Sequence, residues 1–210
     1  MAGKPKRKPK AESRKAGAAA GRRRIVDAAL AMAEREGWAH VSPSRLAAGL
    51  GIGAAGLRRR FRDKDAIADA WFRRAELAML ADLPGDFHLL PAPARLEILY
   101  GRWFDALAPH RRVTADMLKA KLWLFHPHHA VPLAFNLSRL IQWLRDRAGL
   151  DAGGRRKQVE EIALTGLLLA GLAVWCRDDT AGQARTKEFL RRRLARADMW
   201  AARFYGRGGD

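Results

Sequence analysis

Cysteine is nearly absent from this chain, and the common catalytic motifs are absent as well. The sequence has a single cysteine, Cys176, so no disulfide can form within one copy and a reducing compartment suits the composition. It contains no Gly-rich phosphate loop, no Gly-x-Ser-x-Gly elbow and no obvious pair of acids in an apolar setting. These absences favour a binding protein over an enzyme, and we expect neither catalytic residues nor a cofactor.

Long uninterrupted apolar segments are also lacking. The N-terminal stretch has no apolar core of the kind found in secretory signals. The longest apolar run, 162–176, is shorter than the ~20 residues that a membrane-spanning helix needs. We therefore expect a cytoplasmic protein without integral membrane association. Apolar residues still make up 49% of the 210 residues, which suffices for a sizeable core in one domain or two small ones.

Acidic residues are scarce relative to basic ones. The chain carries 40 Lys and Arg against 22 Asp and Glu, for a formal net charge of +18. Ten of the basic residues lie within residues 1–24, where Glu12 is the single acid. This imbalance predicts a polyanionic partner, either nucleic acid or an anionic membrane surface.

The most basic segment, residues 1–21, has no hydrophobic periodicity, and we predict a disordered basic tail there. It is either a solubilising segment or an arm that follows DNA phosphates or lies in the minor groove. A mitochondrial transit peptide is a third interpretation, which the dense Lys-Pro pattern disfavours. Residues 207–210 are predicted to be a disordered C-terminus.

Residues 42–62 have the pattern of two short helices joined by a glycine turn. Ser42 can cap the first helix, and Pro43 suits its first position. Gly49 and Gly51 permit the left-handed backbone of a tight turn. A short second helix that presents arginines and small residues suits a DNA major groove. The same turn also occurs in helical proteins without a DNA role, so the spacing alone predicts only a candidate helix-turn-helix.

A wider pattern sharpens this interpretation. Residues 24–67 resemble the DNA-binding domain of the TetR family of repressors, in order and in spacing. The shared features are Ile25, Ala28-Ala29, Gly37-Trp38, Leu46-Ala47, Gly51-Ile52, Leu57, Phe61 and Lys64. The chain departs from the family pattern at four places: Gly53 replaces a usual serine cap, Gly56 stands where threonine or Gly-Thr is common, and Arg58 and Arg60 replace aromatic residues.

The resemblance implies an all-α, TetR-like fold. An N-terminal three-helix helix-turn-helix domain over 22–67 would bind double-stranded DNA, and a helical body over 68–206 would bind a ligand and dimerise. The resemblance implies a transcriptional regulator, of the repressor type, that binds a palindromic operator as a homodimer. The predicted DNA-binding residues are Arg24, Ser42, Ser44, Arg45, Ala54, Arg58, Arg59, Arg60, Arg62 and Lys64.

The sequence pattern of the body predicts helices only, and segments that contain proline or glycine separate them. Its most apolar segment, 155–177, carries small residues that would allow a partner helix to approach closely, and the following helix has an apolar stripe. Two interpretations stay open: these helices pack across a dimer axis, as the resemblance implies, or they bury each other within one chain.

Aromatic residues at helical spacing in the body predict either a cavity for an unknown small apolar ligand or plain core packing. The candidate pocket residues are Trp103, Phe104, Met117, Trp123, Phe135 and Trp143. His126, His128 and His129 do not have the spacing of a helical metal pair, and no Cys, Asp or Glu lies close by. We expect no metal site there.

An alternative function belongs to a different class. The body also resembles the TetR-like lipid-binding accessory proteins of ubiquinone biosynthesis, which share the fold without repressing genes. The features concerned are residues 107–111, Trp175, Asp178-Asp179, Thr186 and Phe189-Leu190. The glycines and substituted arginines of the second short helix favour this alternative, whereas Phe61, Lys64 and the positive charge of the head favour the regulator.

Overall fold

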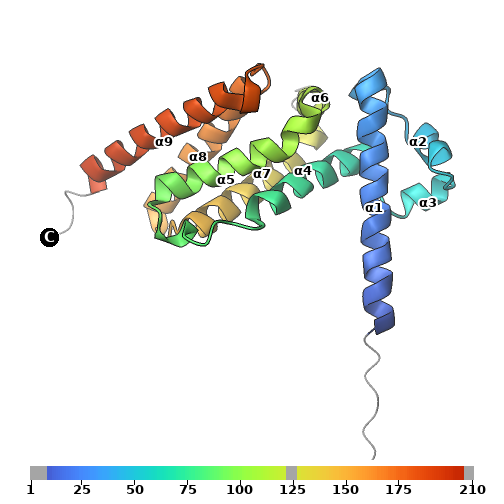
Figure 1. Cartoon of the computed structure of the whole chain (residues 1–210), viewed down its shortest axis with the longest axis horizontal. Helices are drawn as coiled ribbons and strands as arrows, with labels where there is room; N and C mark the ends of the chain where they lie inside the picture. Colours follow the sequence, from blue (N-terminus) through green and yellow to red (C-terminus); the bar gives the residue numbers. More distant parts are fainter. Residues whose placement is uncertain (1–8, 122–126, 206–210) are drawn as a thin grey trace, which may run out of the picture. The chain divides into compact units, whose positions relative to one another are not determined.

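The computed structural model describes residues 9–121 and 127–205, with side chains except at 9–15, 127–136, 198 and 200–205. Within these ranges the chain is helical and contains no strand, which confirms the predicted all-α class. The chain divides into two compact units, up to Trp71 and from Phe72 onward (Figure 1).

The first unit is built from α1 (Pro9–Glu36), α2 (Pro43–Gly49), α3 (Ala54–Arg58) and the first half of α4 (Lys64–Leu80). The apolar side chains that recur at helical spacing along the second half of α1 are buried, and the short helices pack over them. Side chains that are at most 4% exposed form this core: Ile25, Val26, Ala29, Leu30, Ala33, Trp38, Leu46, Leu57, Phe61, Ile67 and Trp71. Gly37 ends α1 with a positive φ of 85°, and its amide donates to the Ala33 carbonyl at 2.8 Å.

The start of α1 differs from the prediction. Residues 9–21, expected to belong to a disordered tail, continue the helix toward the N-terminus. The expectation used amphipathic periodicity, which this segment lacks. Its composition nevertheless favours helix, because alanine has the highest helix propensity and lysine, arginine and glutamate are also good helix formers. A segment attached to an already packed helix also avoids the cost of nucleation.

Both ends of α4 are capped by side chains. At its N-terminus, the Asp63 carboxylate accepts a hydrogen bond from the Ala66 amide at 2.8 Å. At its C-terminus, the Arg102 guanidinium donates to the carbonyls of Ala78 at 3.3 Å, Asp82 at 3.4 Å, and Ala81. The helix therefore has polar partners for its otherwise unpaired terminal groups.

The second unit contains the rest of α4 and the helices α5 (Ala92–Leu107), α6 (Arg111–Lys121), α7 (Pro127–Ala148), α8 (Gly154–Trp175) and α9 (Ala184–Tyr205). Both α5 and α8 pack against α7 and α9. Aromatic rings lie at the centre of this packing, with the ring centroid of Phe104 5.2 Å from Trp103 and 5.7 Å from Trp175. Gly171 of α8 allows the approach of Phe104, because a Cβ at this position would lie 3.3 Å from the ring.

A buried carboxylate fixes the turn between α8 and α9. Asp178 is fully buried, and its oxygens accept hydrogen bonds from the amides and hydroxyls of Thr180 and Thr186 at 2.5–3.0 Å. Burial by itself raises the pKa of Asp178, but these hydrogen bonds outweigh that effect and lower the pKa to about 2. Gln183 completes the turn by accepting from the Trp175 indole and donating to Asp105 at 2.8 Å.

In the part of the chain that the structure describes, α8 is long and apolar enough to cross a membrane by length and composition. The sequence prediction excluded a span because it counted only the run 162–176, whereas the helix begins at Gly154. Core helices of water-soluble proteins pass the same test, so this feature alone assigns no membrane role. Only 22% of its most apolar window is buried within one copy of the chain.

Candidate nucleic-acid interface

The turn between α2 and α3 has the geometry of a helix-turn-helix. Gly51 adopts a positive φ of 64°, and its amide donates to the Ala48 carbonyl at 3.0 Å. The Ile52 amide donates to Ala47 at 3.0 Å, which closes the turn. Gly49, predicted to share the left-handed role, instead lies within α2. A side chain at Gly51 would be strained, because L residues rarely adopt this conformation.

The second short helix, α3, has few local interactions to hold it. It comprises five residues, and Gly53 at its N-cap offers no side-chain hydrogen bond. The side chain of Leu57 is 4% exposed and packs α3 against the core. Gly56 is also buried, yet an added Cβ would meet only ordinary contacts, the nearest being Ile52 at 3.7 Å. The helix therefore depends on packing rather than on capping or propensity.

The last residue of α3 and the two residues that follow it are positively charged and exposed to solvent. Arg58, Arg59 and Arg60 are all exposed, as is Ala54 at the start of the helix. Arg58 donates to the carbonyl of Arg62, and Arg60 donates to the carbonyl of Gly56 at 3.0 Å. Among the described residues, Arg59 forms no hydrogen bond or ion pair, so its guanidinium is available for a partner.

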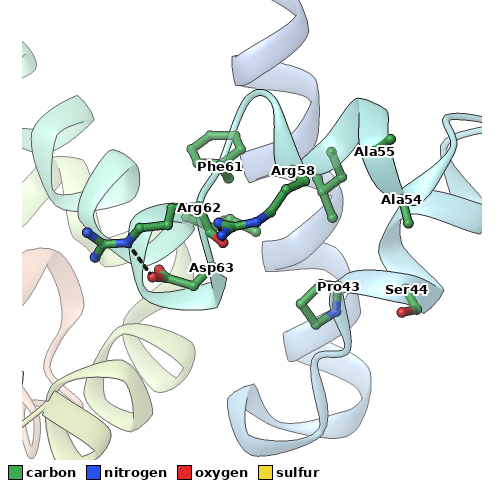
Figure 2. Close-up of a pocket in the computed structure, with 10 residues that line it drawn as sticks. Pro43, Ser44, Ala54, Ala55, Arg58, Phe61, Arg62 and Asp63 are labelled. Atoms are coloured by element: carbon green, nitrogen blue, oxygen red, sulfur yellow. Dashed lines mark hydrogen bonds and ion pairs between the residues drawn. The ribbon is translucent and has the colours of Figure 1, made fainter.

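A groove of about 410 Å³ runs between the starts of α2 and α3 and the turn that leads into α4 (Figure 2). Ser44 and Pro43 line it from α2, and Ala54 and Arg58 line it from α3. The rest of the lining comes from Ala55, Leu57, Phe61, Arg62, Asp63 and Ile67.

Two residues that were predicted to contact DNA form hydrogen bonds with other parts of the protein. Arg45 forms a bidentate ion pair with Glu36, with both N···O distances 2.7 Å, and this hydrogen bonding lowers the pKa of Glu36. Lys64 is half-buried and donates to the carbonyls of Trp38 at 2.7 Å and Ala39 at 3.0 Å. Partial burial lowers the pKa of its ammonium. Lys64 thus holds the start of α4 against the loop after α1.

The remaining predicted contacts differ in how accessible they are. Arg24 is exposed on α1, and Arg62 is exposed with its guanidinium 2.7 Å from Asp63. Ser44 is exposed, whereas Ser42 is half-buried and makes no side-chain cap bond although its backbone has the N-cap conformation. The structure therefore brings Ser44, Ala54, Arg58 and Arg62 together around one groove.

Sequence reasoning missed the role of Arg22. Its guanidinium donates to the Arg60 carbonyl and lies 4.1 Å from the centroid of the Phe61 ring. Arg22 thereby holds α1 against the residues that directly follow α3. The available signal was the run of three arginines at the expected helix start, but no local pattern shows which of them turns inward.

The predicted ligand-pocket residues differ in how far they are buried. Trp103, Phe104 and Met117 are buried, and the Trp103 indole nitrogen is buried without an acceptor among the described residues. Trp143 is 51% exposed and does not line the interior. It lies off the buried stripe of α7 that Leu140, Ile141 and Leu144 form, because of the 3.6-residue helical repeat. Trp123 and His126 lie outside the described residues, as do the side chains of His128, His129 and Phe135.

Comparison with known proteins agrees with this architecture. The model of the family described as bacterial regulatory proteins, tetR family, matches residues 25–71. The crystal structure of the TetR transcriptional regulator from Nitrosomonas europaea ATCC 19718 is 35% identical, with a TM-score of 0.74; the match covers 85% of this chain and 98% of that one. A TetR transcriptional regulator from Rhodococcus sp. RHA1 shares the fold at 16% identity, with a TM-score of 0.60, over 83% of this chain and 93% of that one.

No curated protein matches the chain significantly. The helical body, the helix-turn-helix head and the comparisons together define a DNA-binding regulator of transcription. The chain belongs to the TetR family of transcriptional regulators.

Proposed function

We propose that the chain is a homodimeric repressor that binds a palindromic operator and is released from it by a small apolar ligand. Residues 22–67 serve as the DNA-binding domain, and residues 68–206 serve as the ligand-binding and dimerisation domain. The observation that carries the proposal is the exposed arginine surface of α3 beside the groove at the start of α2. Arginine is the side chain that most often reads guanine in the major groove.

The proposed base-reading residue is Arg59. It is exposed at the C-cap of α3 and has no hydrogen-bond or ion-pair partner among the described residues, whereas Arg58 and Arg60 donate to backbone carbonyls. Ala54, at the start of α3, is small enough for the helix to approach the base edges closely. A bidentate arginine–guanine contact contributes about 1–3 kcal/mol of discrimination.

Dimerisation is proposed through α8. One face of this helix is buried within the chain by Leu164, Leu168 and Trp175. The opposite face is exposed and apolar, with large side chains separated by small ones. Its members recur at helical spacing: Val159, Ile162, Ala163, Gly166, Leu169, Ala170 and Ala173. An exposed stripe of this kind marks a protein interface, and a two-fold partner would bury it against itself.

The ligand site is proposed around Trp103 in the body. The indole N–H of a buried tryptophan normally finds an acceptor, and that of Trp103 has none among the described residues. Phe104 and Met117, also buried, supply an apolar surface. A small apolar molecule with one hydrogen-bond acceptor fits this chemistry. Its coupling to DNA binding would be of the order of 1–3 kcal/mol.

The test is selection of bound duplexes from a random pool, followed by affinity measurements on the recovered site. We expect one palindromic sequence, and an Arg59→Gln variant should bind it with about 1–3 kcal/mol less discrimination against a changed base pair. Arg112→Gln on α6 is the matched control, because Arg112 is exposed but lies in the second unit. Recovery of no preferred sequence would overturn the proposal.

The dimer is tested separately by sedimentation of an Ile162→Glu variant. Ile162 is 73% exposed in one copy, so a charge there costs little in a monomer but a great deal in a buried interface. We expect the variant to sediment as a monomer. Leu89→Glu, at a position 76% exposed outside α8, should leave the dimer intact. An unchanged oligomeric state for Ile162→Glu would contradict the α8 interface.

A second candidate function is a lipid-binding accessory protein that does not read DNA sequence. The five-residue, uncapped α3 and the exposed apolar face of α8 favour it. Mass spectrometry of the purified protein distinguishes the two, since this alternative predicts a copurified isoprenoid lipid together with no operator.

A further inference from the structure

The N-terminal part of α1 extends beyond the core of its unit. The first buried residue of the helix is Ile25, although the helix begins at Pro9. Residues 16–20 are all exposed, and a Cβ added at Gly17 would meet nothing within 4 Å. At 1.5 Å per residue, the segment 9–21 adds about 20 Å of helix. Figure 1 shows it as a direct continuation of the packed half of α1.

This extension is strongly basic. Residues 9–24 contain six basic residues, Lys10, Arg14, Lys15 and Arg22–Arg24, against the single acid Glu12. Arg23 and Arg24 are exposed and have no ion-pair partner among the described residues. A basic helical segment that precedes the first buried residue of its helix has the composition of a polyanion-binding element.

The base of the extension is fixed to the recognition helix. The Gly21 backbone lies against Arg60, since a Cβ there would be 3.4 Å from the Arg60 Nε. The adjacent Arg22 donates to the Arg60 carbonyl and covers the Phe61 ring. The direction of the extension is therefore set by the same contacts that position the end of α3.

Helical periodicity places basic residues on the face that continues from this contact. Residues seven apart lie two turns along the same face of a helix. Arg14 therefore shares a face with Gly21, and Lys15 shares a face with Arg22. The basic pair lies about 10 Å farther along α1 from the point where α1 meets α3.

We infer that residues 9–24 of α1 form a rigid basic arm that contacts the phosphates of the same duplex, outside the base pairs that α3 reads. The inference rests on the proposed DNA-binding function. The arm is about 24 Å long, which corresponds to roughly seven base pairs at about 3.4 Å each. Phosphate contacts carry no sequence information, so the arm raises affinity for every duplex alike.

The experiment measures the affinity of the full chain for its selected site as a function of salt. The variant Lys10→Gln, Arg14→Gln, Lys15→Gln removes three charges while keeping good helix formers. Each lost phosphate contact lowers the slope of log affinity against log salt by about 0.9. We expect the slope to fall by up to about 2.7 per subunit, with an unchanged ratio of specific to nonspecific affinity.

A matched control removes three exposed charges from the second unit: Arg112→Gln, Arg139→Gln, Arg147→Gln. It should leave the slope unchanged, which separates a local contact from a general effect of net charge. Ala18→Pro keeps every charge of the arm but interrupts the helix. Hydroxyl-radical footprinting should show protection beyond the selected site for the wild type, and this flanking protection should disappear with Ala18→Pro.

The two hypotheses fail in different ways. If the wild type binds a selected site and the triple arm variant keeps the same salt slope and the same footprint, the arm is refuted and the DNA-binding function stands. An Ala18→Pro footprint equal to that of the wild type would refute the rigid helical contact. If the wild type selects no site at all, the proposed function fails, whatever the arm variants do.

Discussion

Replacing Gly53 with serine and Gly56 with alanine should stabilise the recognition helix α3. Gly53 occupies the N-cap with φ −65° and ψ 158°, the extended conformation in which a serine side chain can accept a hydrogen bond from the first turn. No atom lies within 4 Å of a Cβ at this position. Gly56 lies inside the helix, and the nearest atom to its added Cβ is 3.7 Å away, an ordinary contact.

The magnitude is the sum of three contributions from the two substitutions. A serine cap gains a few tenths of a kcal/mol over glycine, and removal of glycine from the unfolded chain adds about 0.4–1 kcal/mol. Alanine in place of a helical glycine adds about 0.5–1 kcal/mol. We expect the double variant to raise the free energy of unfolding of the first unit by about 1–2 kcal/mol. If all of this preorganises α3, operator affinity rises by at most about five- to thirtyfold.

Urea denaturation gives the free energy of unfolding, and amide hydrogen exchange of Leu57 and Arg58 reports on α3 itself. The control is Gly101→Ala in α5, where an added Cβ also meets nothing within 4 Å. It should stabilise the second unit and leave exchange in α3 unchanged. A double variant with the wild-type free energy and wild-type exchange in α3 would show that packing of Leu57 alone fixes this helix.

Two further predictions concern polar side chains that bond to backbone groups at helix ends. Asp178→Asn should lower the free energy of unfolding by about 1–3 kcal/mol in urea, because it weakens charge-assisted hydrogen bonds from two threonines. The folded-state pKa of Asp178, about 2, lies below its ordinary 3.8. Its contribution is therefore present above pH 3.8 and is lost as the pH falls through about 2, an acid-side loss that the variant should lack. Arg102→Gln should speed amide exchange at the end of α4, since three carbonyls lose a donor; unchanged exchange would exclude Arg102 as the cap.

Helix positions in this protein were predictable because local rules decide them. Apolar residues at a 3.6-residue period mark the buried half of α1, and Gly37 and Gly51 mark the points where the backbone must turn. The order of those features along residues 24–67 sufficed to identify the family. The extension of α1 to Pro9 was missed, because helix propensity without an apolar stripe gives no periodic signal.

Side-chain partners distant in sequence were not predictable. Lys64 and Arg45 were expected to face DNA, but each finds an internal partner from another segment, the Trp38 and Ala39 carbonyls for one and Glu36 for the other. A positive charge near a helix start is compatible with a phosphate or with a protein acceptor. Only the packed arrangement of α1 beside α2 and α4 selects between them.

The sequence by itself determined the all-helical class, the glycine-turn motif and the excess of positive charge, because these depend on residues that are neighbours along the chain. The tertiary structure decided which arginines stay exposed on α3, that α1 is fastened to α3 through Arg22, and which face of α8 lacks cover. Those outcomes depend on which surfaces meet when the helices pack, and a side chain's exposure is set by neighbours from other helices.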